Sequence, residues 1–141
     1  GVVAVAFGDQ DYTADVGAAV TDDKTESLYA RQRVVAAAAA AGVDALDTVY
    51  TDIEDTDGLR EETAFARQLG YDGKMAIHPD QVPVINDAFT PSDDDIEWAH
   101  RVLAARDSAD TGVFEVDGKM IDAPLIAQAE RILERADETA N

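Results

Sequence analysis

The chain contains no cysteine and very little lysine. Without cysteine it forms no disulfide and performs no thiol chemistry. It also lacks any run of about 18 apolar residues, the length that a membrane-spanning helix needs. No secretory signal pattern is present. Together these absences lead us to expect a cytoplasmic protein.

Positive charge is scarce as well. The chain has 30 acidic residues against 11 basic ones, which gives a net charge of −19. Such a surface repels phosphate backbones and anionic lipids, so nucleic acid and membranes are excluded as expected partners. Charge of this kind usually lines a solvated face. The acidic, lysine-poor composition also resembles that of halophilic proteins, in which dense salt screens the self-repulsion.

The chain does contain enough apolar residues to form a folded core. Its 141 residues are 46% hydrophobic, which predicts one domain with a buried core and argues against disorder. The chain opens at Gly1 directly before the apolar run of residues 2–7. Because a native N-terminus rarely starts inside a buried strand, we expect residues upstream of it.

The first part of the chain alternates between strand and helix patterns. Short β-branched or apolar runs predict strands, and residues 2–7 read as a strand buried on both faces. The segments between them predict right-handed crossovers between parallel strands. The expected strands are 2–7, 45–50 and 75–78, the expected helices 23–41, 58–69 and 82–89, and the expected loops 8–21 and 52–57.

The pattern changes near Pro91. Ser92 and Asp95 form a capping signal for a helix that extends to about Arg106. Residues 113–121 contain an Asp-Gly pair typical of a type I′ hairpin turn, and a last helix begins near Pro124. We therefore divide the chain into residues 1–91 and 92–141.

Three motifs resemble one enzyme family. They are the FGDQDY segment of residues 7–12, the GKMAIHPDQ segment of residues 73–81 and the GKMIDAP segment of residues 118–124. They resemble the citrate lyase beta-subunit-like group, which includes malyl-CoA, methylmalyl-CoA and citramalyl-CoA lyases. The resemblance covers essentially the whole chain but only about half of the family's usual length.

The family resemblance implies a fold. It is a TIM-like (β/α)8 barrel with a C-terminal lid. Three strands cannot close a barrel. The expected fold class is therefore α/β: the C-terminal half of such a barrel, holding its last three strands, followed by a helix–hairpin–helix lid.

Asp11 is the candidate metal ligand. It follows the first expected strand, where the βα-loops of a barrel carry catalytic groups, and a carboxylate suits a hard cation. An aspartate in a turn can instead satisfy loop amides. The family resemblance makes Asp11 one of two carboxylate ligands of Mg2+; the other, a glutamate on the preceding strand, is not in this chain. Asp9 departs from the small or hydrophobic residue often found there in the family.

Asp122 is the candidate catalytic residue. Its place just before Ala123 and Pro124 is an excellent helix N-cap position. In the family, the aspartate of this motif is a lid carboxylate in acid/base catalysis that enters the site of a neighbouring subunit. Both roles can hold together. The resemblance also implies a homo-oligomer, a trimer or a hexamer.

His78 and Pro79 are the candidate residues for binding coenzyme A. Pro79 forces an extended conformation on His78, and in the family this turn shapes the wall near the CoA thioester. Lys74 is expected before the third strand, at the opposite rim, with a structural role or an ion pair.

Other charged residues receive supporting roles. Asp47 is expected to support the site from the second strand, while Asp52, Glu54 and Asp55 read as solvated. The basic residues at positions 31 and 33 are expected in ion pairs within or between helices.

The implied reaction is a Mg2+-dependent carbon–carbon lyase reaction on a malyl-CoA-like 3-hydroxyacyl-CoA. A reversible Claisen-type cleavage gives a 2-oxo acid and an acyl-CoA, with Asp122 as the proton donor. Two alternatives stay open: a malyl-CoA thioesterase that uses the same site, and a non-catalytic fragment that lacks half of it.

Overall fold

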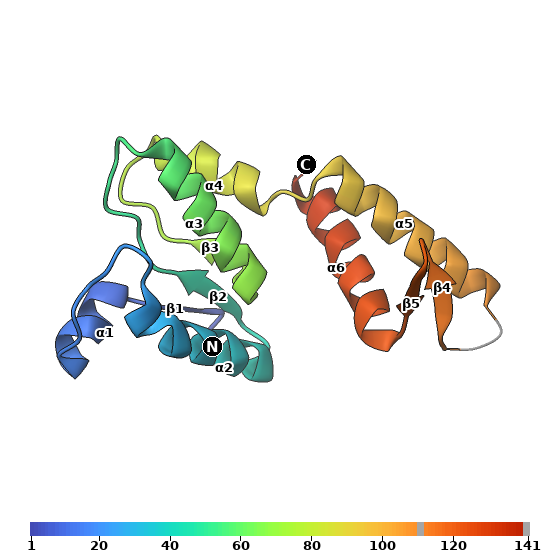
Figure 1. Ribbon diagram of the computed structural model, residues 1–141, viewed down its shortest axis with the longest axis horizontal. Coiled ribbons are helices and arrows are strands. Elements are labelled where there is room, and N and C mark those ends of the chain that lie inside the picture. The colour runs from blue at the N-terminus through green and yellow to red at the C-terminus, as the bar shows by residue number, and fades with distance from the viewer. Residues whose placement is uncertain (110–111, 140–141) are drawn as a thin grey trace. The chain divides into compact units, whose positions relative to one another are not determined.

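The computed structural model describes residues 1–109 and 112–139. Two compact units make up the chain, Gly1–Phe89 and Thr90–Asn141 (Figure 1). The first unit is built on a parallel sheet and the second on two helices with a hairpin.

The sheet of the first unit has three strands in the order β1-β2-β3, namely β1 (Ala4–Ala6), β2 (Asp44–Asp47) and β3 (Gly73–Lys74). All pairings are parallel, as the strand–helix alternation predicts. The expectation that residues 2–7 are buried on both faces is wrong. Val2 and Val3 are 70% and 80% exposed, because β1 lies at the edge of the sheet and starts only at Ala4.

The third strand lies earlier than expected. The apolar run of residues 75–78 predicts the strand, but β3 consists of Gly73 and Lys74. The Met75 amide still donates to the Asp47 carbonyl, at 3.0 Å, and β2 ends at that residue. Beyond this point no strand residue remains to pair with, so the apolar run continues as a loop.

A helix occupies part of the expected loop of residues 8–21. It is α1 (Asp9–Val16), and it ends at Gly17 with a φ of 70°. Asp9 and Asp11 lie in its first turn, where a carboxylate interacts favourably with the positive end of the helix dipole. The Thr13 hydroxyl donates to the Asp9 carbonyl at 2.9 Å. Polar residues around most of this short helix leave no apolar period to detect.

The longer helices follow the sequence pattern closely. A 3-10 turn η1 (Thr25–Ser27) leads into α2 (Leu28–Ala41), which ends at Gly42. Gly42 has a φ of 66°, the left-handed conformation that glycine adopts at little cost. The other two helices of this unit are α3 (Thr56–Leu69) and α4 (Gln81–Phe89).

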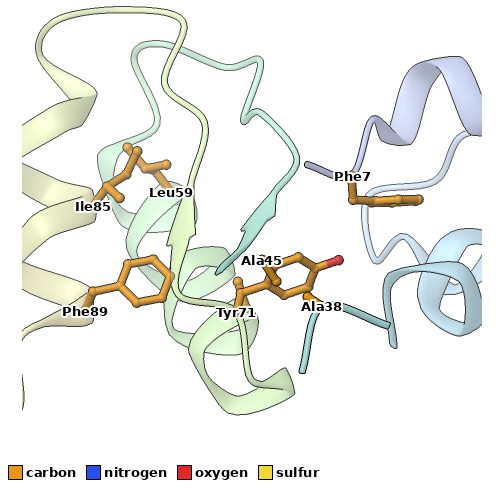
Figure 2. Close-up of a cluster of buried hydrophobic side chains, with 8 residues drawn as sticks. Phe7, Ala38, Ala45, Leu59, Tyr71, Ile85 and Phe89 are labelled. Atoms are coloured by element: carbon orange, nitrogen blue, oxygen red, sulfur yellow. The ribbon is translucent and has the colours of Figure 1, made fainter. Parts of the chain in front are cut away.

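One hydrophobic cluster joins the strands and helices of the first unit (Figure 2). Leu59 of α3 meets Ile85 of α4, while Tyr71 lies in the part of the cluster formed by small residues. The Tyr71 hydroxyl donates to the Arg31 carbonyl at 2.9 Å, so this buried phenol is satisfied. The buried residues are Phe7, Ala38, Ala45, Leu59, Ala66, Tyr71, Ile85 and Phe89.

The second unit contains α5 (Asp93–Ser108), β4 (Phe114–Val116), β5 (Lys119–Ile121) and α6 (Ala123–Thr139). The predicted capping box is present, since Asp95 N–H donates to Ser92 Oγ at 3.1 Å and Ser92 N–H to Asp95 Oδ2 at 3.2 Å. Strands β4 and β5 pair antiparallel. The turn residues Asp117 and Gly118 both have positive φ, as a type I′ hairpin requires.

A separate core holds the second unit together. Ala99 of α5 and Ala129 of α6 are fully buried, and such small residues let two helices approach closely. Val102, Val116 and Ile121 complete the buried set. Within residues 1–109 and 112–139, no helix is both long enough and apolar enough to cross a membrane.

Candidate active site

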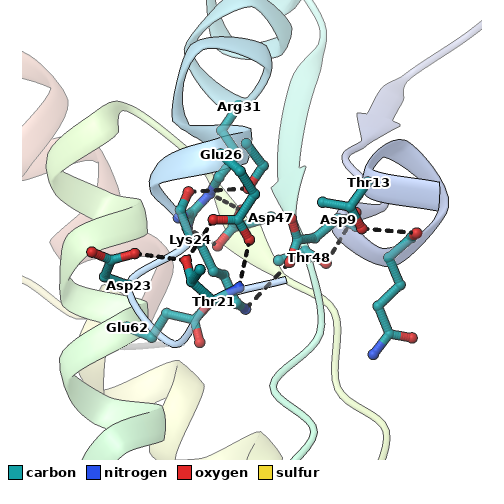
Figure 3. Close-up of polar contacts among 12 residues, drawn as sticks. Asp9, Thr13, Thr21, Asp23, Lys24, Glu26, Arg31, Asp47, Thr48 and Glu62 are labelled. Atoms are coloured by element: carbon teal, nitrogen blue, oxygen red, sulfur yellow. Dashed lines mark hydrogen bonds and ion pairs between the residues drawn. The ribbon is translucent and has the colours of Figure 1, made fainter. Parts of the chain in front are cut away.

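The carboxyl ends of the three parallel strands gather polar side chains at one edge of the sheet. Asp9 follows β1, Asp47 ends β2 and Lys74 ends β3. The Asp9 amide donates to Thr48 Oγ1 at 3.1 Å, which ties the start of α1 to the end of β2 (Figure 3). Ligand sites in α/β proteins lie at such edges, because the loops that follow the strands converge there.

Asp11 is exposed in the first turn of α1. Its carboxylate turns back over Gly8, so that a Cβ at Gly8 would lie 3.2 Å from Asp11 Oδ2. Within residues 1–109 and 112–139 this carboxylate has no hydrogen bond or ion pair. The alternative role, an aspartate that satisfies loop amides, therefore has no contact to support it. Both oxygens are available to a ligand.

The donor set around Asp11 fits a magnesium ion in part. Among the described residues, no group of three or more histidine or acidic side chains gathers in a geometry that could hold a metal. Magnesium typically keeps several waters and takes one or two carboxylates together with substrate oxygens. A single free carboxylate such as Asp11 fits that requirement as one ligand.

Beneath this edge lies a buried ion network, made up of Asp9, Lys24, Arg31, Asp47, Glu62 and Lys74. Figure 3 labels all of these residues except Lys74. The centre of the network is Asp47. Arg31 Nε donates to Asp47 Oδ1 at 3.1 Å and Arg31 Nη2 to Oδ2 at 2.7 Å, a bidentate pair with both side chains almost fully buried. Arg31 also lies over the ring of Phe65, with 5.5 Å to the ring centroid.

The rest of the network leads from Asp47 to α1. Lys74 Nζ donates to Asp47 Oδ2 and to Glu62 Oε1, each at 3.1 Å. Lys24 Nζ donates to the same Glu62 oxygen at 2.6 Å and lies 4.0 Å from Asp9 Oδ2. Three cations thus face three carboxylates. This balance is what a buried charged cluster needs, since an unpaired buried charge is very costly.

Two expectations about this network require correction. Lys74 was expected before its strand at the opposite rim, but it is the last residue of β3, in register with Asp47. The strand starts earlier than the apolar run suggests, which moves Lys74 to the same edge as Asp47. The expected ion pair of Lys74 is present. Arg31 was expected to pair within or between helices, yet its partner Asp47 lies on a strand.

The loop after β2 is held by a short polar contact. Tyr50 Oη donates to Asp55 Oδ2 at 2.6 Å, and Asp55 Oδ1 accepts from the Gly58 amide at 2.9 Å, capping α3. The bond to Asp55, together with burial, raises the pKa of Tyr50 to about 12. The Tyr50 hydroxyl and the Gly58 amide lower the pKa of Asp55. A Cβ at Gly58 would collide with both oxygens of the pair, so this position needs glycine. Asp55 is thus exposed, as expected, but has structural partners.

The loop after β3 carries His78 and Pro79. His78 Nδ1 accepts from the Asp80 amide at 3.3 Å, and its side chain is 40% exposed. Gln81, only 2% exposed, fixes this loop to the one before it: Gln81 Oε1 accepts from the Ile77 amide and Gln81 Nε2 donates to the Tyr50 carbonyl, each at 2.9 Å. Gln81 is the last residue of the GKMAIHPDQ motif, but no role for its side chain was expected from the sequence.

Asp122 belongs to the second unit and lies directly before α6. Its carbonyl accepts from the Leu125 amide at 3.1 Å and the Ile126 amide at 3.0 Å, so its backbone occupies the N-cap position. Its carboxylate is exposed and makes no hydrogen bond or ion pair with any described residue. Pro124, at the second helical position, has no amide hydrogen to donate to a capping side chain, and the Leu125 amide donates to the Asp122 carbonyl. Among the described residues, no contact therefore occupies this carboxylate.

Comparison with known proteins gives a consistent result. Residues 1–79 match the HpcH/HpaI aldolase/citrate lyase family. The chain is 42% identical to the mitochondrial citramalyl-CoA lyase of Mus musculus over 133 residues, which cover 92% of this chain and 39% of the mouse enzyme. It is 38% identical to the citrate lyase subunit beta of Haemophilus influenzae over 138 residues, which cover 96% of this chain and 47% of that subunit.

Solved structures agree. Protein CitE of Mycobacterium tuberculosis, in complex with magnesium, acetoacetate and coenzyme A, matches with a TM-score of 0.84 and 38% identity, over 94% of this chain and 51% of CitE. A citrate lyase of Burkholderia xenovorans matches with a TM-score of 0.84 and 28% identity, over all of this chain and 47% of that protein. The chain thus spans about half or less of the length of these relatives. Its sequence and its α/β fold together show that the chain belongs to the HpcH/HpaI aldolase/citrate lyase family.

Proposed function

We propose that this chain forms the C-terminal half of a magnesium-dependent carbon–carbon lyase that cleaves a malyl-CoA-like 3-hydroxyacyl-CoA into a 2-oxo acid and an acyl-CoA. The observation that carries the proposal is Asp11, an exposed carboxylate at the carboxyl end of β1 that has no partner among the described residues. It lies within a chain that is 42% identical to a citramalyl-CoA lyase. In the related CitE structure magnesium, acetoacetate and coenzyme A occur together.

The fold part of the proposal is a half barrel with a lid. Strands β1 and β3 are the outer strands of the sheet, and among the described residues each pairs on one edge only. An unpaired edge is a liability that closure into a barrel removes. We assign residues 1–91 to the last three strands and helices of a (β/α)8 barrel and residues 92–141 to a helix–hairpin–helix lid.

The chain's own residues then have distinct tasks. Asp11 would hold the magnesium ion, which, when bound, supplies a Lewis acid for the carbonyl of the 2-oxo acid. His78 and Pro79 would form the wall beside the CoA thioester. In the cleavage direction the 3-hydroxyl would give its proton to water, the carbon–carbon bond would break, and the acyl-CoA carbanion would take a proton from Asp122. In the condensation direction Asp122 removes that proton again.

We further propose that the enzyme is a cytoplasmic homo-oligomer, a trimer or a hexamer, in which Asp122 serves a neighbouring subunit. The free carboxylate of Asp122 at a helix N-terminus supports a role other than capping. The Asp122 carbonyl accepts two helical hydrogen bonds, which fix the backbone position from which the carboxylate extends.

The test uses two variants of the full-length protein that carries this chain. Asp122→Asn preserves the shape and the N-cap preference but removes the acid, so turnover should fall by roughly 10²–10⁴-fold with little change in stability. Asp11→Ala should abolish magnesium-dependent turnover. Mixed oligomers of the two variants should recover partial activity, because some sites then receive both intact groups.

Each outcome has a definite meaning. Near-wild-type turnover of Asp122→Asn would show that this residue only caps the helix. Retained activity of Asp11→Ala would show that Asp11 is not the metal ligand. No recovery in confirmed mixed oligomers would place Asp122 in the site of its own subunit. The products distinguish the reactions, since a lyase releases a 2-oxo acid with acyl-CoA and a thioesterase releases malate with free CoA.

A further inference from the structure

Lys24 has an unusual backbone conformation. Its φ is 51° and its ψ 31°, in the left-handed region, which side chains other than that of glycine rarely adopt. Among the described residues, Asp117 is the only other non-glycine residue with positive φ, and its hairpin turn requires that conformation. Lys24 lies at the start of a 3-10 turn, where no hairpin accounts for it. Such strain persists only where surrounding contacts enforce it.

The Lys24 side chain contacts two carboxylates. Its ammonium group donates to Glu62 Oε1 at 2.6 Å and lies 4.0 Å from Asp9 Oδ2, with only 15% of the side chain exposed (Figure 3). Glu62 is itself fixed by Lys74 at 3.1 Å. Lys24 therefore connects the first turn of α1 with α3 and with the rest of the buried ion network.

Asp9 depends on this cation. It is 3% exposed, and its Oδ1 is buried without a hydrogen-bond partner in the part of the chain that the structure describes. Among the described residues, the only ion pair of its other oxygen is with Lys24. A buried carboxylate without a nearby cation is strongly disfavoured. Without Lys24, the first turn of α1 would have to shift to bring Asp9 to water.

Such a shift would displace Asp11. The two residues lie in the same helical turn, whose backbone moves as a unit, and the Asp11 carboxylate is aimed back over Gly8. We propose that Lys24 is a positioning residue for Asp11: through Asp9 it fixes the first turn of α1, and with it the metal-binding carboxylate. This inference rests on the proposed function, which makes Asp11 the magnesium ligand.

The experiment measures Mg2+ binding by titration calorimetry on the full-length protein, beside its thermal stability. Lys24→Met retains the aliphatic stem and removes the charge, and its dissociation constant for Mg2+ should rise at least about 10-fold. Lys24→Arg retains a cation and should stay within about 3-fold of the wild type. The double variant Lys24→Met/Asp9→Ala should bind Mg2+ more tightly than Lys24→Met alone, because it no longer contains the buried carboxylate that would have to reach water.

The outcomes separate this inference from the function on which it rests. Asp11→Ala is the reference: if it binds Mg2+ as the wild type does, Asp11 is not the ligand and both proposals fail. If Asp11→Ala loses the metal while Lys24→Met binds it normally, only the role of Lys24 fails. A lower melting temperature of Lys24→Met with unchanged Mg2+ affinity would show a purely structural ion pair and would also overturn the inference. A double variant that binds Mg2+ no more tightly than Lys24→Met would contradict the link through Asp9.

Discussion

At the scale of single residues, Asp47 is the anion on which two buried cations depend. Its oxygens accept three hydrogen bonds, two from Arg31 and one from Lys74. The side chains of Asp47 and Lys74 have no exposed surface and that of Arg31 has 1%. A buried pair of this kind adds little net stability over an apolar pair, but the loss of one partner leaves the others uncompensated.

Replacing Asp47 should therefore be severely destabilising. Asp47→Ala leaves two buried cations with Glu62 as the remaining anion close to Lys74, and we expect a loss of about 3–5 kcal/mol in the free energy of unfolding. Urea denaturation measures it as a lower midpoint. The control is Asp44→Ala, an exposed aspartate on the same strand, which should change stability by no more than about 0.5 kcal/mol. Equal effects of the two changes would mean that the network carries no such cost.

Asp47 could be recognised from the sequence more easily than the other members of the buried ion network. Asp47 is the one carboxylate in the expected strand 45–50, and its position there led us to expect a supporting role at the site. Lys24 and Glu62 give no such signal, since 38 residues separate them and both lie among many other charged residues. Asp11 and Asp122 were found through motifs, whereas their free carboxylates could be established only from the contacts that the fold leaves unmade.

At the scale of elements, prediction succeeded where an apolar period or a cap was present. The helix ends at Gly42 and Gly70, the capping box of α5 and the Asp-Gly hairpin are all confirmed. The helix α1 was missed because it is polar nearly all round. The position of β3 was wrong because strand length depends on how far the neighbouring strand extends, and β2 ends at Asp47.

Gln81 connects two of these elements, the loops that follow β2 and β3. Both ends of its side-chain amide are used, one by the Ile77 amide and the other by the Tyr50 carbonyl. Its contact with Ile77 lies directly before His78 and Pro79. We infer that Gln81 maintains the conformation of the loop that would bind coenzyme A.

Replacing Gln81 should loosen that loop. Gln81→Met has a similar volume and no hydrogen bonds, so the Ile77 amide and the Tyr50 carbonyl lose their partner, at a cost of about 1–3 kcal/mol. Hydrogen exchange of the Ile77 amide should accelerate at least about 10-fold, and the KM for the acyl-CoA should rise more than kcat falls. Gln68→Met, on the exposed side of α3, is the matched control and should alter neither. Unchanged exchange at Ile77 would contradict the role assigned to Gln81.

At the scale of the whole molecule, the few cations are concentrated in the interior and in local pairs. Of the three lysines, Lys24 and Lys74 belong to the buried ion network. Arg101 pairs with Asp117, and Arg106 with Glu130. Much of the positive charge is thereby used locally, and the excess of acidic residues remains on the surface.

This distribution predicts stability that depends on salt. With a net charge of −19 the compact state repels itself, and the Debye length shortens from about 10 Å at 0.1 M salt to about 3 Å at 1 M. The melting temperature should therefore rise from low to molar KCl.

A variant with Asp44→Lys, Glu61→Lys and Asp87→Lys, three exposed carboxylates, separates charge screening from general effects of salt on hydrophobic burial. It should melt higher than the wild type at low salt and gain less from added KCl, because each change moves the net charge two units towards zero. The same gain in both proteins would assign the salt effect to burial, and a flat or falling melting temperature in the wild type would show that self-repulsion does not limit its stability.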